Sequence, residues 1–295
     1  MIVRTDLNVM RLYRIWLLKL NKVNLGLLVL TILFLPYCSA NMAPSMERWS
    51  GKVAVVTGAS AGIGASIAEL LVENGIKVVG FARRVELITA HAEKLKNKKG
   101  SLHGMKVDLT KTQEIIDAFK KVEEEYGPVS ILVNNAGVFE QTTLCDGGDI
   151  EKWKKTFEIN VIALCIATKE AVAIMKKHKI NGHIIHINSV AGHRPVNFVG
   201  ENVYPASKYA VTSLTESLRY ELLKTGTKIK VTSISPGLVR STEIFKAAGA
   251  EIKGTEVEGI ALNPEDVSYA VIYALSSPPH VQVHEVTLKP IGSDI

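Results

Sequence analysis

The stretch Val53-Ala-Val-Val-Thr-Gly-Ala-Ser-Ala-Gly-Ile-Gly64 decides the fold of this chain. Its first residues are small or β-branched and apolar, which is typical of a buried strand. Three glycines follow, at positions 58, 62 and 64, and Ala65–Val72 then carries apolar residues at helical spacing. Glycines let a backbone turn sharply and approach a ligand, and a helix that begins at Gly62 directs free N–H groups into the turn. The pattern predicts a dinucleotide site; the alternative is a tight turn without a ligand.

The length and composition of the chain favour one large α/β domain or two small ones. It has 295 residues, of which 47% are hydrophobic and 22% charged, enough to bury a full core without disulfides. The three cysteines cannot all pair and lack metal-ligand spacing, so we expect no metal site. Residues 1–45 carry five basic residues against one acidic residue, a net +4, which leaves +2 of the total +6 for residues 46–295. A domain so close to neutral gives no case for nucleic-acid binding.

Residues 1–45 form a leader that we exclude from the fold prediction. The run Leu25–Tyr37 is apolar and uncharged, basic residues precede it, and the small residues Ser39 and Ala40 follow it. This is the layout of a signal peptide or signal anchor, although about 13 apolar residues fall short of the roughly 20 that span a membrane. The alternative is an upstream extension that is not always translated, with the domain beginning at Met46. The first interpretation predicts an endomembrane or secretory protein with membrane contact through the leader only, and the second a cytoplasmic one.

Apolar, β-branched segments alternate with segments of helical period through residues 46–295. The spacings between these segments suit βαβ crossovers. The alternation therefore predicts an α/β fold: a single doubly wound Rossmann domain with a parallel sheet of about seven strands. Residues 241–262 have no clear period and are expected to form a mobile flap. After the first strand, the predicted strands are Ile76–Phe81, Leu102–Val107, Val129–Val133, His183–Ile187, Lys228–Ile234 and Val281–Leu288, and the later predicted helices are Lys111–Tyr126, Trp153–Met175, Tyr204–Lys224 and Pro264–Ser276.

The end of the second predicted strand indicates which dinucleotide binds. In NAD-binding folds of this kind, a carboxylate about 20 residues after the glycines holds the 2′-hydroxyl of the adenosine ribose. This chain has Ala82-Arg83-Arg84 there, and two guanidinium groups suit a 2′-phosphate. We therefore expect NADP; the alternative is two solvated arginines at a strand end. Asp108, at the end of the third strand, can accept a hydrogen bond from the adenine amino group or cap the following helix.

Tyr204 and Lys208 are four residues apart and share one face of a predicted helix. A phenol with a pKa near 10 is a poor base at neutral pH, and a nearby ammonium group lowers that pKa because it favours the phenolate. Tyr204 thereby becomes a usable general acid or base. Ser189 ends the preceding strand, where its hydroxyl can bind a substrate oxygen. The Tyr–Lys pair alone is usually only a helix face, but together with Ser189 and the glycine turn it indicates a catalytic site rather than a coincidence.

Asparagines mark two further positions. Asn134-Asn135-Ala136-Gly137 follows the fourth predicted strand, where asparagines can fix the backbone turn and the small Ala-Gly pair lets a flat ring approach. Asn160 lies inside a predicted helix, where asparagine is unfavourable by propensity. Neither observation identifies a function by itself.

Taken together, these motifs resemble those of the short-chain dehydrogenase/reductase family over about residues 47–290. The resemblance implies an enzyme that uses NAD(P)(H), in which Tyr204 exchanges a proton with the substrate oxygen. It further implies that Lys208 lowers the pKa of Tyr204 and holds the nicotinamide ribose. Ser189 would orient the carbonyl, and Asn160 would support a proton relay through water. The predicted cofactor-binding residues are Gly58, Ser60, Gly62, Ile63, Gly64, Arg83, Arg84, Asp108, Leu109, Asn135, Ala136, Gly137, Tyr204, Lys208, Pro236, Gly237, Val239 and Thr242.

Four shorter segments narrow the resemblance to the insect farnesol dehydrogenase-like group and its vertebrate relatives, the member-eleven ketosteroid and carbonyl reductases. Both groups depend on NADP(H), in agreement with Arg83 and Arg84, and the resemblance implies a lipophilic, farnesol-like alcohol or carbonyl substrate. The alternatives are a ketosteroid or general carbonyl reductase and, more distantly, a non-catalytic dinucleotide-binding scaffold. Ala61 departs from the pattern, because many NADP-preferring relatives carry a basic residue there. Relatives usually form dimers or tetramers, which implies a homo-oligomer. The segments are Met46–Trp49, Gly192–Arg194, Asn263–Asp266 and Val286–Pro290.

Overall fold

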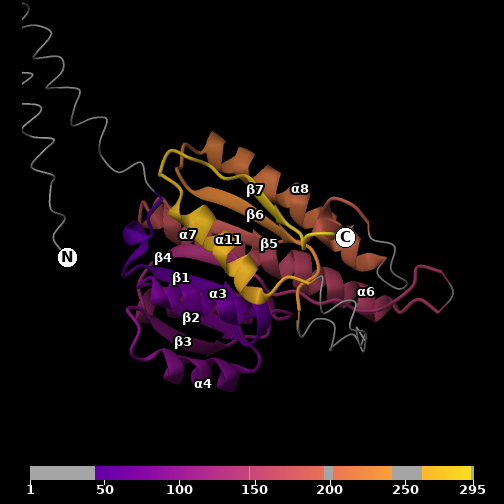
Figure 1. The fold of residues 1–295 in the computed structure, drawn as a ribbon, viewed down its shortest axis with the longest axis horizontal. Helices are drawn as coiled ribbons and strands as arrows, with labels where there is room; N and C mark the ends of the chain where they lie inside the picture. The colour runs from indigo at the N-terminus through magenta and orange to yellow at the C-terminus, as the bar shows by residue number, and fades with distance from the viewer. Residues whose placement is uncertain (1–43, 146, 196–201, 241–260, 294–295) are drawn as a thin grey trace, which may run out of the picture. The chain divides into compact units, whose positions relative to one another are not determined.

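A seven-stranded sheet forms the centre of the domain (Figure 1). The computed structural model describes residues 44–145, 147–195, 202–240 and 261–293, so most of the leader and of the predicted flap lies outside the described residues. The strand order is β3-β2-β1-β4-β5-β6-β7, and every neighbouring pair is parallel, which confirms the predicted doubly wound fold. The strands are β1 Val53–Thr57, β2 Lys77–Ala82, β3 Ser101–Lys106, β4 Val129–Asn134, β5 His183–Ile187, β6 Lys230–Pro236 and β7 Glu285–Leu288.

The direction of strand order reverses at β1, which lies between β2 and β4. Val53 pairs with Lys77 on one side and with Val129 on the other. All five residues of β1 are buried, which is why the sequence shows a continuous apolar run rather than an alternation. In sheets of this kind, ligands bind outside the carboxyl ends of the strands at the point of reversal. The fold therefore directs attention to the turns that follow β1 and β4.

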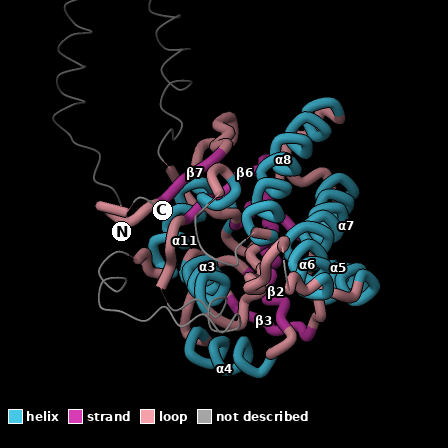
Figure 2. The backbone as a smooth tube through the Cα atoms, turned by 90° about the vertical axis from the view of Figure 1, so that its right-hand side faces the viewer, coloured by secondary structure: helices cyan, strands magenta, loops and turns pink. Residues whose placement is uncertain are grey.

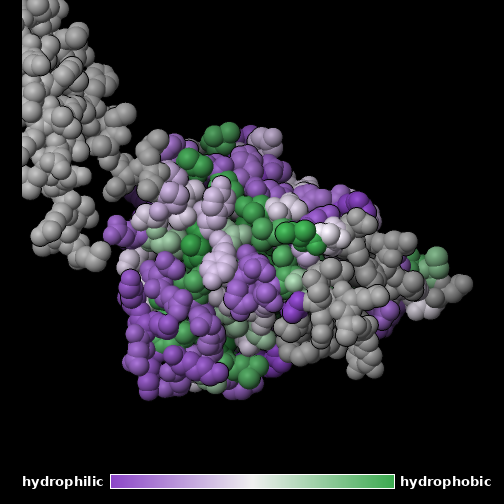
Figure 3. Space-filling model, in the orientation of Figure 1, coloured by the Kyte–Doolittle hydropathy of each residue, from purple (hydrophilic) through white to green (hydrophobic). Residues whose placement is uncertain are grey.

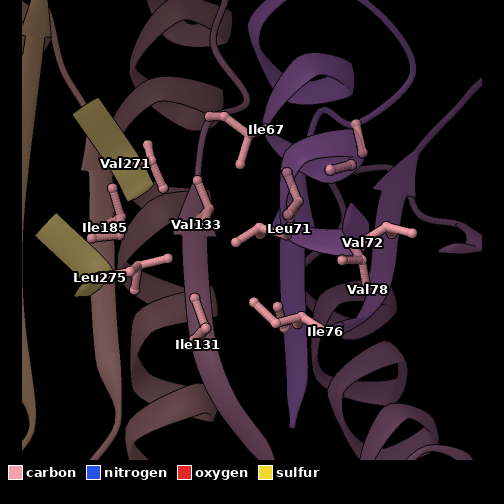
Figure 4. Packing of buried hydrophobic residues seen from close by; sticks show 14 of the residues in the cluster. Ile67, Leu71, Val72, Ile76, Val78, Ile131, Val133, Ile185, Val271 and Leu275 are labelled. Atoms are coloured by element: carbon pink, nitrogen blue, oxygen red, sulfur yellow. The ribbon is translucent and has the colours of Figure 1, made fainter. Parts of the chain in front are cut away.

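Helices cover both faces of the sheet (Figure 2). On one face, Leu71 and Val271 pack against Val133 of the sheet (Figure 4). On the other face, the Phe119 ring meets the Phe81 ring edge to face, with the ring centroids 5.4 Å apart. The hydrophilic surface around α4 in Figure 3 is the solvent side of a helix whose apolar side is buried. The first face carries α3 Gly62–Glu73, α4 Val85–Leu95 and α11 Pro264–Ser276; the second carries α5 Thr112–Glu125, α7 Ala163–Lys177 and α8 Val203–Lys224.

The segment predicted as one helix over Trp153–Met175 is helical, but it is not one α-helix. It consists of α6 Ile150–Phe157, a π-helical turn Glu158–Ile162 and α7. The N–H of Ala163 donates to the carbonyl of Glu158, five residues earlier, which widens the helix by one residue. Such π turns often occur at functional sites, and this one contains Asn160.

The last strand is shorter than predicted, because the first half of Val281–Leu288 lies outside it. There, Gln282 and Val283 are joined to β6 by hydrogen bonds that involve side chains rather than by a backbone ladder. The Gln282 amide donates to the Val231 carbonyl, and the Thr232 hydroxyl donates to the Val283 carbonyl at 2.7 Å. Only Glu285–Leu288 pairs with β6 in a regular register.

The start of the domain is fixed against α11. The 3₁₀ turn Glu47–Trp49 buries the indole of Trp49, whose Nε1 donates to the Leu275 carbonyl at 2.8 Å. The guanidinium group of Arg48 donates to the same carbonyl at 2.6 Å. These bonds satisfy a carbonyl in the last turn of α11, where helix carbonyls lack helical partners. No helix within the described ranges has the length and apolar character to cross a membrane.

Candidate active site

Predicted site residues follow the carboxyl ends of strands β1 to β6, whereas Asn160, Tyr204 and Lys208 lie on helices. The glycine turn follows β1, Arg83 follows β2, and Asp108 lies just after β3. Asn135 follows β4, and Ser189 lies two residues after β5. Because carboxyl ends of parallel strands share one edge of the sheet, residues far apart in the sequence meet on one side of the domain. Thr242, the last predicted cofactor residue, lies outside the described residues.

The glycine turn leaves room where an anion would lie. Gly58 and Gly62 adopt the left-handed conformation, with φ angles of 68° and 56°. A Cβ atom on Gly64 would collide with the Gly58 carbonyl oxygen, so only glycine fits there. A Cβ on Gly62, in contrast, would meet no atom within 4 Å. Ala61, at the N-cap of α3, offers no side-chain cap to the free N–H groups. Open space above an uncapped helix N-terminus fits the pyrophosphate of a dinucleotide.

Thr57 and Asn135 join the turn after β1 to the segment after β4. The Thr57 hydroxyl oxygen accepts hydrogen bonds from the backbone N–H groups of Asn135 (3.0 Å) and Ala136 (3.1 Å). The Asn135 amide donates to the Thr57 carbonyl at 2.9 Å and also to the Gly58 carbonyl, at 3.3 Å. The Asn135 amide nitrogen therefore braces the glycine turn. The role of Thr57 was missed by sequence reasoning, although a hydroxyl at a strand end before a glycine turn is a usable signal.

Asp108 and the two arginines lie at the adenosine end of the predicted cofactor site. Arg83 and Arg84 are both exposed. The Asp108 carboxylate accepts hydrogen bonds from the N–H of Thr110 (3.0 Å) and from its hydroxyl (2.8 Å). The backbone bond from Thr110, more than any other contact, holds the pKa of Asp108 below its usual value, and the charge of Arg83 adds to this. The alternative role for Asp108, as the cap of α5, is not observed, because Lys111 holds the N-cap position.

Tyr204 and Lys208 lie one turn apart near the start of α8, as predicted. The Lys208 ammonium nitrogen is 5.8 Å from the centroid of the Tyr204 ring and donates to the Ile187 carbonyl at 2.9 Å. Lys208 is only 5% exposed, and its burial lowers its pKa to about 8. The side chain is still protonated at pH 7, so a positive charge stands beside the phenol that would exchange the proton.

Asn160 links the loop after β4 to the catalytic helix. Its side-chain oxygen accepts from the N–H of Val138 at 2.8 Å, and its amide donates to the Val138 carbonyl at 2.9 Å. The same amide donates to the Ser207 hydroxyl at 3.0 Å, and that hydroxyl donates to the Tyr204 carbonyl at 2.7 Å. These bonds assign Asn160 a positioning role, whereas the proton relay through water stays a prediction.

Phe139 is a second residue that sequence reasoning missed. It is 5% exposed, and its ring meets the Tyr204 ring edge to face, with the centroids 5.6 Å apart. Because the backbone of Val138 is held at both its N–H and its carbonyl, the next residue is placed firmly against the phenol. A Phe directly after the Asn-Asn-Ala-Gly-Val segment carries no signal by itself, since an apolar residue there also suits an ordinary core.

Ser189 begins a short 3₁₀ turn, Val190–Gly192. Its hydroxyl oxygen accepts a hydrogen bond from the N–H of Ala191 at 3.1 Å, which leaves the hydroxyl proton for another acceptor. A substrate carbonyl or alkoxide oxygen is such an acceptor. The geometry is thus compatible with the predicted role of Ser189.

The remaining predicted cofactor residues are placed as follows. Ser60 and Ile63 are half-buried in the glycine turn, and Ile63 also packs on the core. Leu109 and Ala136 line a small recess together with Thr57. A Cβ on Gly137 would lie 3.4 Å from Asn160 Oδ1 and 3.9 Å from Lys208 Nζ, which places this glycine beside these two side chains. Pro236 ends β6, Gly237 donates to the Leu288 carbonyl at 2.7 Å, and Val239 is buried.

The fold and the site define an oxidoreductase of the Rossmann type that needs a nicotinamide cofactor. The chain belongs to the short-chain dehydrogenase family, whose model, described as "short chain dehydrogenase", matches residues 52–253.

The chain is similar to several characterised proteins along nearly their whole lengths. It is 48% identical over 248 residues to "farnesol dehydrogenase" of Aedes aegypti, which covers 84% of this chain and 99% of the relative. It is 45% identical over 251 residues to "dehydrogenase/reductase SDR family member 11" of Mus musculus, covering 83% and 96%. Among solved structures, the closed form of a serine dehydrogenase complexed with NADP⁺ is 32% identical, with a TM-score of 0.74 and coverage of 82% and 96%. An alcohol dehydrogenase of Thermococcus sibiricus complexed with 5-hydroxy-NADP is 25% identical, with a TM-score of 0.73 and coverage of 83% and 98%.

Proposed function

We propose that this protein is an NADP-dependent dehydrogenase of a lipophilic, farnesol-like alcohol, or a reductase of the corresponding carbonyl. The observation that carries the proposal is the Tyr204–Lys208 pair on α8, in a domain similar throughout to a farnesol dehydrogenase. A ketosteroid or general carbonyl reductase is the second candidate, because the similarity to the vertebrate member-11 protein covers the same span at nearly the same identity.

The chemistry follows from the groups around Tyr204. In oxidation, the Tyr204 phenolate takes the proton of the substrate hydroxyl, and the carbon–hydrogen bond of the alcohol breaks as a carbonyl forms. A nicotinamide bound at the site would supply the hydride acceptor for oxidation and the hydride donor for reduction. The Lys208 ammonium favours the phenolate, and the Ser189 hydroxyl donates to the substrate oxygen. In reduction, Tyr204 gives its proton back at the same oxygen.

The preference for NADP rests on the end of β2. Arg83 and Arg84 are exposed there, and no carboxylate occupies the position that holds an adenosine ribose hydroxyl in NAD-binding relatives. A guanidinium group pairs with a phosphate through two parallel hydrogen bonds. The NADP found in the two solved structures described above supports the same preference.

A substrate panel with both cofactors tests the activity. Purified protein is assayed with farnesol, a 17-ketosteroid and a small diketone, each with NAD(H) and NADP(H). We expect turnover of farnesol with NADP⁺, and a loss of more than about a hundredfold in kcat for Tyr204→Phe, because the acid–base group is gone. Absence of farnesol turnover, with reduction of the ketosteroid or diketone, selects the second candidate. If Tyr204→Phe leaves every hydride transfer unchanged, the catalytic assignment is wrong and a binding scaffold is favoured.

The cofactor preference is tested with Arg83→Asp. A lost pair between a guanidinium group and a phosphate is worth about 1.5–3 kcal/mol, so the KM for NADPH should rise roughly ten- to a hundredfold, while the KM for NADH changes little. Lys52→Asp is the matched control, since it makes the same charge change at an exposed residue before β1, at the opposite edge of the sheet. A lower KM for NADH than for NADPH in the unaltered protein contradicts the proposal.

Oligomerisation and localisation are also open to direct test. We propose a homo-oligomer that forms through the helices containing Asn160 and Tyr204, on which Phe157 and Tyr220 are exposed. Size-exclusion chromatography with light scattering measures the mass in solution, and a monomeric mass rejects the oligomer. For residues 1–45 we retain both interpretations, a targeting segment and an upstream extension that is not always translated. N-terminal sequencing of the protein from its own cells distinguishes them, because a chain that starts at Met46 rejects the anchor.

A further inference from the structure

The segment Asn188–His193 carries Ser189 and is tied to α8 by three side chains. The Asn188 amide donates to the Thr212 hydroxyl at 2.8 Å, and that hydroxyl is within 3.0 Å of the Gly192 carbonyl. The Tyr209 hydroxyl donates to the His193 carbonyl at 2.6 Å. One side of the segment is thus fixed to the helix that carries Tyr204 and Lys208.

The His193 end of the segment is tied to β6 and β7 through one side chain, in addition to the backbone bond from Asn188 to Ile234 of β6. The imidazole Nε2 of His193 is 2.6 Å from Glu285 Oε1 and 3.1 Å from the hydroxyl oxygen of Ser235. The same carboxylate oxygen accepts from the Ser235 hydroxyl and, at 3.2 Å, from the Ser233 hydroxyl. Ser233 and Ser235 are buried, so Glu285 is held by the sheet, and His193 is held by Glu285.

Packing on the helix side leaves the segment little room to adjust. A Cβ atom on Gly192 would lie 2.8 Å from the Lys208 carbonyl oxygen and 2.9 Å from the Asn188 amide group. The backbone of Gly192 therefore lies directly on the turn of α8 that carries Lys208. If the contact to β7 were lost, the start of the segment would still be held by the Asn188 N–H, which donates to the Ile234 carbonyl of β6 at 2.7 Å, but the end at His193 would be held only by the bonds to α8.

The exposure of the pair argues against a role in stability alone. The side chains of His193 and Glu285 are 36% and 29% exposed. Ion pairs at this exposure contribute about 0–1 kcal/mol to stability. Catalysis is far more sensitive to placement, since a displacement of about 1 Å at a reacting group can cost roughly a hundredfold in rate.

We propose that His193 and Glu285 are positioning residues that hold the Ser189 hydroxyl in place against Tyr204, by anchoring the segment Asn188–His193 to β7. The pair acts through Ser189 and does not itself touch the reacting atoms. This inference rests on the proposed oxidoreductase function.

The test compares His193→Ala with a matched ion pair elsewhere. His178 and Glu123 form an equivalent pair, also at 2.6 Å, with a histidine that is also 36% exposed, but it joins α7 to α5 away from the active site. We expect His193→Ala to lower kcat about tenfold with the KM for NADPH unchanged within about twofold, and His178→Ala to leave kcat unchanged. His193→Gln should restore most of the activity, because its amide Nε2 can still donate to Glu285. Equal kcat values for the two alanine variants overturn the proposal.

A second readout does not depend on turnover. The N–H of Ala191 donates to Ser189 Oγ, so its hydrogen exchange reports the position of the Ser189 hydroxyl. We expect exchange at Ala191 at least tenfold faster in His193→Ala than in His178→Ala, and close to normal in His193→Gln. Unchanged protection of Ala191 in His193→Ala overturns the inference even if no substrate has been found. Faster exchange with no turnover of any substrate by the unaltered protein instead places the failure in the proposed function.

Discussion

Lys208 carries its charge where almost no water reaches it. It is 5% exposed, and its burial lowers its pKa from 10.5 to about 8. A shift of that size corresponds to about 3 kcal/mol of unfavourable free energy in the charged form at neutral pH. The proposed reaction needs that charge beside Tyr204. Lys208 is thus a residue at which function and stability oppose each other.

We predict that Lys208→Met stabilises the cofactor-free protein and inactivates it. After subtracting about 1 kcal/mol for the lost hydrogen bond to the Ile187 carbonyl, the free energy of unfolding at pH 7 should rise by about 2 kcal/mol. In the unaltered protein, the unfolded chain holds more protons than the folded one between pH 8 and 10.5, so Lys208 makes stability rise with pH in that window. The variant should lack this contribution. Urea denaturation at pH 7, 9 and 10 measures both effects.

Lys230 provides the control for this prediction. It is 8% exposed, burial lowers its pKa to about 8, and its ammonium donates to the Pro278 carbonyl at 2.7 Å, far from Tyr204 in the fold. Lys230→Met should therefore also change the pH dependence of unfolding, but leave kcat intact. A Lys208→Met protein that unfolds more easily than the unaltered one at pH 7 contradicts the argument.

Single residues differ in how far the sequence can predict them. Tyr204, Lys208 and Ser189 have reactive groups at diagnostic spacing, so the pattern alone indicates them. Thr57 and Phe139 act through contacts between elements that are far apart in the sequence. A threonine at a strand end and a phenylalanine in a loop are too ordinary to predict such roles. His193 lies between these cases, because the resemblance includes it in Gly192–Arg194, but its partner Glu285 is 92 residues away.

Among the elements, β5 combines an apolar environment with two histidines. His183 and His186 are 0% and 1% exposed. The ring of His183 binds the Thr232 hydroxyl at 2.8 Å, and that of His186 binds the Thr215 hydroxyl at 2.9 Å. Burial, with a smaller contribution from nearby positive charges, lowers the pKa of each to about 3. Both rings are therefore neutral in the folded protein at any mildly acidic pH.

We predict that these histidines dominate the acid sensitivity of the fold. Between about pH 6.5 and 3, the unfolded chain protonates them and the folded chain does not, so the free energy of unfolding falls as the pH is lowered through that window. Each histidine contributes about 1.4 kcal/mol per pH unit there. In His183→Gln, which can keep a bond to Thr232, the loss between pH 6 and 4.5 should be smaller by about 2 kcal/mol. Urea denaturation across this range measures it.

His280→Gln is the control for the His183→Gln prediction, because it makes the same substitution at an exposed histidine. As the pH is lowered, the free energy of unfolding of the His280→Gln protein should fall as steeply as that of the unaltered protein. An unchanged slope in His183→Gln would show that the ring of His183 accepts a proton in the folded state, contrary to its burial.

The elements were predicted well where a single hydrophobic pattern decides them. α11 has the predicted bounds, Pro264–Ser276, because a capping box and a proline mark its start in the sequence. The π turn at Asn160 was not foreseen, since one extra residue in a helix changes the apolar period too little to be recognised. The start of β7 was placed too early because Val281–Val283 has strand-like composition, while its hydrogen bonds to β6 run through the side chains of Gln282 and Thr232.

At the scale of the whole domain, the carboxyl ends and the amino ends of the strands have different roles. The turns at the carboxyl edge bring together the groups of the candidate active site, and their placement depends on contacts between strands. Near the amino edge, the 3₁₀ turn Glu47–Trp49 closes the end of α11. The first residues of the domain therefore belong to its core, although the motifs that reveal the family begin only at Val53.

This division predicts how the chain responds to shortening from its N-terminus. A chain that starts at Met46 should fold and keep kcat and KM within about twofold, since it retains Trp49, which is 5% exposed. A chain that starts at Lys52 loses the indole and both hydrogen bonds to the Leu275 carbonyl. Removing a buried tryptophan costs about 3–5 kcal/mol, so this chain should unfold at much lower urea concentration. At low temperature, where this chain is still folded, its kcat should be normal, because the candidate active site lies at the carboxyl edge of the sheet. Equal stability of the two chains would show that the domain begins after Trp49 and that its packing on α11 is dispensable.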